Sequence, residues 1–180
     1  MNINVTGLIL ASGGSSRMGR DKAALKYNGV SFLQLAVGHL KAADCDEIYI
    51  NNADNLTDLI SGLGPLGGIY TALTSHPKVQ YWLIIPIDMP TLTSEILTRL
   101  QQGLHDADVA RFDNEMFPIL LKSSDQMRNH ITALATDKQQ SYSMRQFTKP
   151  FNVNILPKPR GSEAAFANIN SPEDYETLCI

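Results

Sequence analysis

The stretch NVTGLILASGGSSRMGRDK, residues 4–22, joins an apolar run to a polar loop rich in glycine. The aliphatic and β-branched residues of its first part are typical of a buried strand. Its second part holds three glycines among serines, arginines and a lysine. Glycine lets backbone amides approach phosphate oxygens closely. A glycine-rich turn directly after a strand therefore predicts a site for a phosphate group, with a merely flexible turn as the alternative.

Two cations in this loop, Arg17 and Lys22, add positive charge to what the backbone amides supply. The loop differs from a Walker A sequence, because Gly19 is followed by Arg20 and Asp21 rather than by lysine and a hydroxyl residue. The GxGxxG spacing of dinucleotide-binding loops is also missing. The sequence thus predicts a phosphate site of another kind.

Short β-rich runs alternate with segments of helical periodicity after this loop. The strands expected in the first half are residues 4–11, 47–51 and 80–88, and the helices are residues 31–43, 67–76 and 93–104. The apolar run within residues 80–88 fits a strand that is buried on both faces of a parallel sheet. The alternation predicts an α/β fold with a mostly parallel sheet.

The second half of the chain is expected to continue the same domain. Its expected elements are paired strands at 106–113 and 115–123, helices near 124–135 and 141–148, and late strands at 151–156 and 165–170. Ser171 can cap a last helix, with Pro172 at its first position and Asp174 completing a capping box. Since no repeat or linker divides the sequence, residues 1–180 are expected to form one domain.

Composition narrows the class of protein. The formal net charge is -3 and both signs are mixed along the chain, which argues against a broad basic face for nucleic acid. Cys45 and Cys179 lack CxxC spacing and are expected to be unpaired thiols of a reducing compartment. The apolar N-terminal run is too short for a signal peptide or a membrane span. We expect a soluble, cytoplasmic protein without nucleic-acid or membrane partners.

Asp88 is a lone carboxylate directly after the apolar run and before Pro90. At the carboxyl end of a central strand, such a charge suits Mg²⁺, which takes one or two carboxylates and leaves its other positions to water and phosphate oxygens. Capping of a helix or turn near Pro90 is the alternative.

Four segments, in order, resemble the signatures of the MobA-like nucleotidyltransferases, and most closely those of the molybdenum cofactor guanylyltransferases. LASGGSSRMGRDK (10–22) is similar to LAxGxSxRMGxDK, and DLISGLGPLGGI (58–69) to D…GPLxGI. IPIDMP (85–90) is similar to PxDxP, and FANINSPEDY (166–175) to NxNTPEDL. The resemblance covers nearly the whole chain and implies a three-layer, Rossmann-like α/β/α sandwich.

The resemblance also implies a reaction that moves a nucleoside monophosphate from a triphosphate onto an acceptor phosphate and releases pyrophosphate. The implied substrates are GTP and a molybdopterin-type cofactor, with Mg²⁺ bound by Asp88, and transient contact with molybdoenzymes or their chaperones is left open. The implied catalytic residues are Arg17, Lys22 and Asp88. The implied nucleotide-binding residues are Leu10, Ala11, Ser12, Gly13, Lys22, Asn51, Asp58, Gly68 and Asp88, and the implied acceptor region holds Asn168 and Asn170.

Two other functions remain open. One is a cytidylyltransferase for the same cofactor, or another MobA-like nucleotidyltransferase, although Asp21 before Lys22 and the GPLGGI segment favour the guanylyl branch. The other is a non-catalytic nucleotide-binding or cofactor-delivery module. Such a module would be expected to lose Arg17, Lys22 or Asp88, and all three are present.

Three positions depart from the pattern of the guanylyltransferases. Ser12 stands where glycine is frequent, the segment between Asn51 and Asp58 is short, and Phe117 stands where a polar residue often contacts the acceptor. The loop PKPRGSE, with Lys158 and Arg160, either meets an anionic pterin phosphate or is a solvated surface loop.

Overall fold

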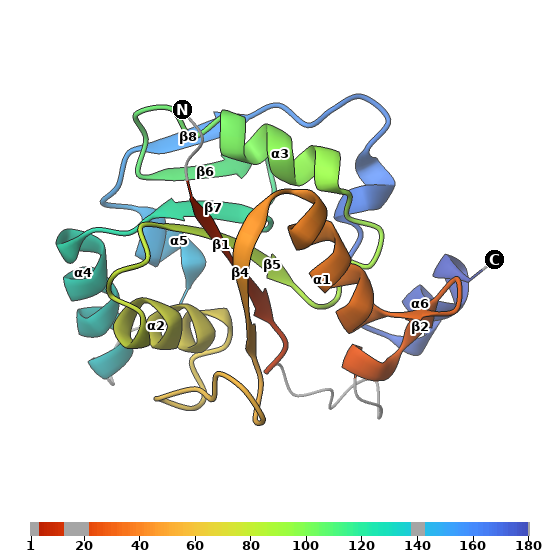
Figure 1. Ribbon diagram of the computed structural model, residues 1–180, viewed down its shortest axis with the longest axis horizontal. Coiled ribbons are helices and arrows are strands. Elements are labelled where there is room, and N and C mark those ends of the chain that lie inside the picture. Colours follow the sequence, from red (N-terminus) through yellow and green to blue (C-terminus); the bar gives the residue numbers. More distant parts are fainter. Residues whose placement is uncertain (1–3, 13–21, 138–142, 180) are drawn as a thin grey trace.

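A six-stranded sheet forms the centre of the protein, with helices on both of its faces (Figure 1). This computed structural model describes residues 4–12, 22–137 and 143–179. The strands are β1 (Val5–Leu10), β4 (Cys45–Asn51), β5 (Tyr81–Pro86), β6 (Val109–Phe112), β7 (Ile119–Lys122) and β8 (Val153–Leu156). Their order is β4-β1-β5-β7-β6-β8, and only the pairs that involve β7 are antiparallel. The expected mostly parallel α/β sheet is confirmed.

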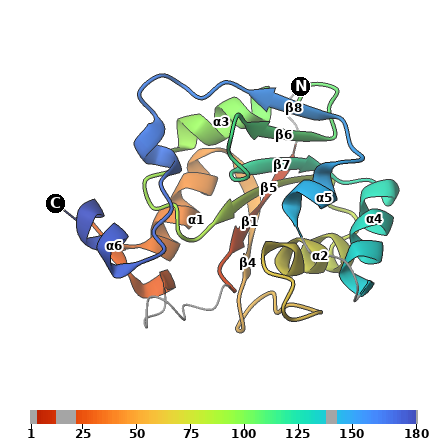
Figure 2. The same ribbon diagram turned by 180° about the vertical axis from the view of Figure 1, so that it is seen from behind.

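Helices cover the sheet from both sides, as a three-layer sandwich requires (Figures 1 and 2). The apolar side chains of α1 (Phe32–Ala42) and α3 (Ser94–Gln102) share one core cluster. Those of α2 (Pro65–Ser75), α4 (Asp125–Thr136) and α5 (Met144–Thr148) share the cluster on the opposite face. Strand β5 contributes to both clusters through alternate residues, which explains its unbroken apolar sequence.

Hydroxyl side chains define where several helices begin. Ser31 and Ser171 each form a capping box, at α1 and at α6 (Pro172–Leu178), and the Thr93 hydroxyl caps α3. The expected roles of Ser171 and Asp174 at the start of the last helix are therefore confirmed. The helix expected at 141–148 is observed as α5, and residues 141 and 142 of that prediction lie outside the described residues.

The prediction of a strand at residues 165–170 is wrong. A 3₁₀ helix, η2 (Glu163–Phe166), precedes an irregular segment there. The backbone N–H of Ile169 donates to the carbonyl of Asp88 at 2.8 Å, and that of Asn170 donates to the Asp174 carboxylate at 2.9 Å. Because these donors bond a loop carbonyl and a side chain, the segment makes no ladder with a neighbouring strand.

A small hairpin after the glycine-rich loop was not expected from the sequence. The 3₁₀ helix η1 (Lys22–Ala24) leads into the hairpin, whose two strands are β2 (Lys26–Tyr27) and β3 (Val30–Ser31). Its turn holds Asn28 and Gly29 with φ values of 50° and 81°. An Asn-Gly pair between two strands is a standard signal for such a turn.

The strand order reverses at β1. From β1 the chain runs through α1 to β4 on one side, and then through α2 to β5 on the other side of β1. In open α/β sheets, ligands bind beyond the carboxyl ends of the strands at such a reversal. Two backbone bonds hold these ends together, from Ala11 N to Asn51 O and from Ile87 N to Leu10 O, each 3.0 Å.

Within the described part of the chain, no helix is both long and apolar enough to cross a membrane.

Replacing Leu40 by alanine is expected to lower the free energy of unfolding by about 2–5 kcal/mol. Leu40 is 0% exposed and fills the space above Gly7 of β1, so the shorter side chain leaves a cavity. As a control, Leu59→Ala removes a side chain that is 56% exposed and should change the stability by about 0.5 kcal/mol or less. Urea denaturation followed by circular dichroism measures both, and equal losses would contradict this packing.

Candidate active site

A cavity of about 510 Å³ lies at the carboxyl ends of β1 and β5. It is lined by Leu10, Ser12, Lys22, Asp58, Gly62, Gly64, Pro65, Pro86, Ile87, Asp88, Phe117 and Asn170. Six of these were predicted as site residues, from segments far apart in the sequence. The glycines and prolines of the lining were not predicted individually, although most of them lie inside the GPLGGI and IPIDMP motifs.

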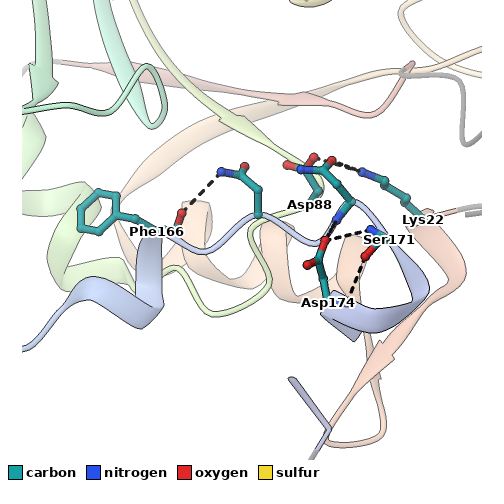
Figure 3. A network of polar contacts seen from close by, with 7 residues as sticks. Lys22, Asp88, Phe166, Ser171 and Asp174 are labelled. Carbon is teal, nitrogen blue, oxygen red and sulfur yellow. Dashed lines mark hydrogen bonds and ion pairs between the residues drawn. The ribbon is translucent and has the colours of Figure 1, made fainter. Parts of the chain in front are cut away.

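Asp88, Lys22 and Asn170 all line this cavity and form a polar cluster, in which Figure 3 shows Lys22 pointing toward Asp88. The Lys22 Nζ atom donates to Asp88 Oδ2 at 3.1 Å and to Asn170 Oδ1 at 2.8 Å. The Lys22 and Asp88 side chains are only 15% and 19% exposed, so this ion pair is screened less than one at the surface. Lys22 thus links the start of η1 to the end of β5 and to the segment before α6.

The second carboxylate oxygen of Asp88, Oδ1, is buried and has no hydrogen-bond partner among the described residues. A buried acceptor without a partner costs free energy, and such a group at a cavity marks a place for a ligand. Groups of three or more histidine, cysteine, aspartate or glutamate side chains suited to hold a metal are absent from the described residues. A cation here would therefore take one carboxylate and complete its shell with water and ligand oxygens, which is the usual coordination of Mg²⁺.

Asn51, Asp58 and Ser12 form a second polar cluster, beside the end of β4. The Asn51 side chain is 1% exposed, and its Nδ2 atom donates to Leu56 O at 2.8 Å and to Asp58 Oδ1 at 2.7 Å. The Ser12 hydroxyl lies 2.6 Å from Asn51 Oδ1 and 3.4 Å from Asp58 Oδ2. Asn51 is therefore a buried anchor, and it fixes Asp58 where that carboxylate lines the cavity.

Gly68 allows the first turn of α2 to approach these strand ends closely. A Cβ atom at this position would lie 2.4 Å from Asn51 Oδ1 and 2.8 Å from Leu10 Cδ2. Any side chain would therefore push Asn51 or Leu10 away. Gly68 thus lies against Asn51. Gly68 itself is not among the residues lining the cavity.

Other predicted site residues have different surroundings. Gly13 and Arg17 lie outside the described residues. Asn168 is not among the residues lining the cavity, and its Nδ2 atom donates to Phe166 O at 3.5 Å. Lys158 pairs with Glu115 and lies 5.1 Å from the centre of the Phe166 ring. These contacts satisfy the charge of Lys158 inside the protein, and nothing in the local sequence indicated Glu115 as its partner.

The fold places a cavity with charged side chains at the carboxyl edge of the sheet, as in α/β proteins that bind ligands at such an edge. Residues 7–151 match the MobA-like NTP transferase domain. Because this match covers most of the chain, the protein belongs to that family and is a nucleotidyltransferase, as its motifs indicated. Enzymes of this family generally need a divalent metal.

Several named proteins are similar to this chain along nearly its whole length. A molybdenum cofactor guanylyltransferase of Xanthomonas euvesicatoria is 29% identical over 177 residues, covering 96% of this chain and 93% of the relative. A probable molybdenum cofactor guanylyltransferase of Carboxydothermus hydrogenoformans is 30% identical over 188 residues, covering 97% and 95%. The crystal structure of molybdopterin-guanine dinucleotide biosynthesis protein A from Archaeoglobus fulgidus superposes with a TM-score of 0.71 at 17% identity, covering 96% of each chain. This last likeness shows the fold.

Gly68→Ala is expected to destabilise the protein by about 1–3 kcal/mol, because the new methyl group overlaps the buried Asn51 side chain. Gly38 of α1 provides a matched control, since a Cβ atom there meets nothing within 4 Å. Gly38→Ala should raise stability by about 0.5–1 kcal/mol through helix propensity. Denaturant unfolding of both variants tests this, and a neutral Gly68→Ala would refute the close approach of α2 to Asn51.

Proposed function

We propose that this nucleotidyltransferase transfers GMP from GTP to the phosphate of a molybdopterin-type cofactor, with Mg²⁺ as its metal and pyrophosphate as the second product. The observation that carries the proposal is the pair of carboxylates, Asp88 and Asp58, which line one cavity together with Lys22. Asp88 and Lys22 suit the phosphates, and Asp58 suits the base. The names of the guanylyltransferase relatives support the same substrates.

Charge stabilisation and positioning suffice for this chemistry. The acceptor is a phosphate that is already ionised near neutral pH, so no side chain has to remove a proton from it. Attack on the α-phosphorus breaks its bond to the β-phosphate, and negative charge develops on the departing pyrophosphate. Lys22, and Arg17 from the loop before it, are the cations that would stabilise this charge.

Asp88 is the residue that would hold the metal. Its unpartnered Oδ1 atom and the absence of a larger cluster of acidic or histidine ligands in the described chain fit an ion that keeps water and phosphate oxygens. Bound there, Mg²⁺ would neutralise charge on the reacting phosphates. Lys22 contacts the other carboxylate oxygen, so the lysine and the metal can share Asp88 without competing for one atom.

Asp58 would select the base. Guanine offers its N1–H and its exocyclic amine as two adjacent donors, and one carboxylate can accept both. Asn51 donates one hydrogen bond to Asp58 Oδ1, and the single Ser12 hydroxyl proton goes to Asn51 Oδ1, so both Asp58 oxygens keep acceptor capacity for the ligand. Cytosine lacks this pair of adjacent donors.

Asn168 and Asn170 would form the acceptor region. Asn170 lines the cavity directly, whereas Asn168 lies two residues before it in the segment that follows η2. Phe117 also lines the cavity and offers an aromatic face on which a pterin ring can pack.

Asp88→Asn is expected to leave the fold intact and to lower magnesium-dependent turnover by a factor on the order of a hundred or more, because the metal loses its charged ligand. Asp106→Asn, in an exposed turn, serves as the control with the same chemical change and should keep normal turnover. Pyrophosphate release at varied Mg²⁺ measures both. Near-normal turnover of Asp88→Asn would make this residue structural.

The unmodified protein is expected to prefer GTP over CTP by about a thousandfold in kcat/KM, because cytosine leaves the Asp58 carboxylate without a matching pair of donors. In Asp58→Ala this preference should collapse, mainly through loss of GTP use. Steady-state rates with each nucleotide test the idea. Equal use of both by the unmodified protein argues against guanylyl transfer, and a preference for CTP points to the cytidylyl branch.

A further inference from the structure

Asp174 makes one more contact than its place in the capping box requires. Its Oδ2 atom accepts the backbone N–H of Ser171 at 2.9 Å, and the Ser171 hydroxyl accepts the N–H of Asp174 at 3.2 Å. These two bonds close the box at the start of α6. The same Oδ2 atom also accepts the backbone N–H of Asn170 at 2.9 Å (Figure 3). This third bond lies outside the capping box and goes to a residue that lines the cavity.

The residue held by this extra bond is Asn170, which lines the cavity. Asn170 Oδ1 accepts a hydrogen bond from Lys22 Nζ at 2.8 Å, next to the ion pair of Lys22 with Asp88. One residue earlier, the N–H of Ile169 donates to the Asp88 carbonyl at 2.8 Å. The backbone at residues 169–170 is therefore tied on one side to Asp88 and on the other to Asp174. The second tie fixes Asn170 itself.

Helix α6 is in turn held against the segment that carries Lys22. The Tyr175 hydroxyl donates to the Lys26 carbonyl at 2.7 Å, and its ring lies 6.1 Å from that of Phe32. Lys26 is four residues beyond Lys22, in the hairpin that follows η1. Asp174, one residue before Tyr175, therefore has a fixed place relative to both partners of the bond between Lys22 and Asn170.

The Asp174 side chain does not line the cavity. The N–H bond from Asn170, followed by that from Ser171, holds the pKa of Asp174 below its usual value, so the group is a carboxylate at neutral pH. An ionised acceptor forms stronger bonds to backbone donors than a neutral one does. The carboxylate is therefore suited to fixing a backbone.

We infer that Asp174 is a positioning residue for the transfer reaction, which holds the Asn170 backbone so that the Asn170 side chain orients the Lys22 ammonium beside Asp88. This inference rests on the proposed function, because it assigns Asp174 a part in the step that Lys22 serves. Asp174 acts through Asn170 and touches neither substrate nor metal. Its loss should therefore affect turnover more than nucleotide affinity.

The test compares the two halves of the capping box. Asp174→Ala and Ser171→Ala each remove one half and should lower the unfolding temperature to a similar degree. Only Asp174→Ala also releases Asn170. We expect Asp174→Ala to lower kcat by about tenfold or more with KM for GTP changed by less than about twofold, whereas Ser171→Ala keeps kcat within about twofold. Pyrophosphate release with GTP and molybdopterin measures these constants.

Asp174→Asn separates geometry from charge. Asparagine keeps one oxygen that can accept both N–H bonds, so kcat should return to within about threefold of the unmodified protein. Amide hydrogen exchange gives a readout that does not depend on catalysis. The Asn170 amide should exchange faster in Asp174→Ala than in Ser171→Ala, and slowly in Asp174→Asn.

Equal losses of kcat in Asp174→Ala and Ser171→Ala would overturn the inference and reduce Asp174 to a helix cap. Equal exchange of the Asn170 amide in these two variants would overturn it as well. If the unmodified protein released no pyrophosphate from GTP with molybdopterin, the proposed function would fail. The exchange comparison would then still decide whether Asp174 holds Asn170.

Discussion

The meeting of three parallel strand ends at one edge of the sheet is the constraint on which the site depends. Strands β4, β1 and β5 end at Asn51, Leu10 and Pro86, and two backbone bonds continue their pairing beyond those ends. Because the chain leaves β1 towards opposite sides, the connections diverge there and leave room for a ligand. Both polar clusters of the cavity are built directly on these ends.

The two clusters differ in how their polar groups are satisfied. Around Asp88, a poorly solvated carboxylate is compensated by Lys22 on one oxygen only, which keeps the other oxygen available to a cation. Around Asn51, a fully buried amide satisfies its own hydrogen-bonding groups and in doing so fixes Asp58 at the cavity. In the proposed reaction, the Asp88 cluster would bind the phosphates and the Asp58 cluster would recognise the base, both along one edge of the sheet.

The sequence predicted the elements that depend on neighbouring residues. It did not predict contacts between residues far apart in the chain. Periodicity and cap residues predicted the sheet class, α1, α3 and the start of α6, because these depend on residues a few positions apart. The motifs also singled out Lys22, Asp88 and Asn170. Their bonding could not be derived, since Lys22 and Asn170 are 148 residues apart and only the fold brings them together. Residues 165–170 were predicted as a strand for the same reason: the bond from Ile169 to Asp88 is invisible in local sequence.

The central claim is that the α-phosphate of GTP, with its nucleoside, moves to an acceptor phosphate in this cavity. The most direct measurement incubates the protein with Mg²⁺, molybdopterin and GTP labelled at the α-phosphate, and separates the products. The account predicts that the label enters the pterin product in equal amount to the pyrophosphate released, and that neither appears when molybdopterin is omitted. Label that stays in free GTP or GMP, with no pterin product, would contradict it.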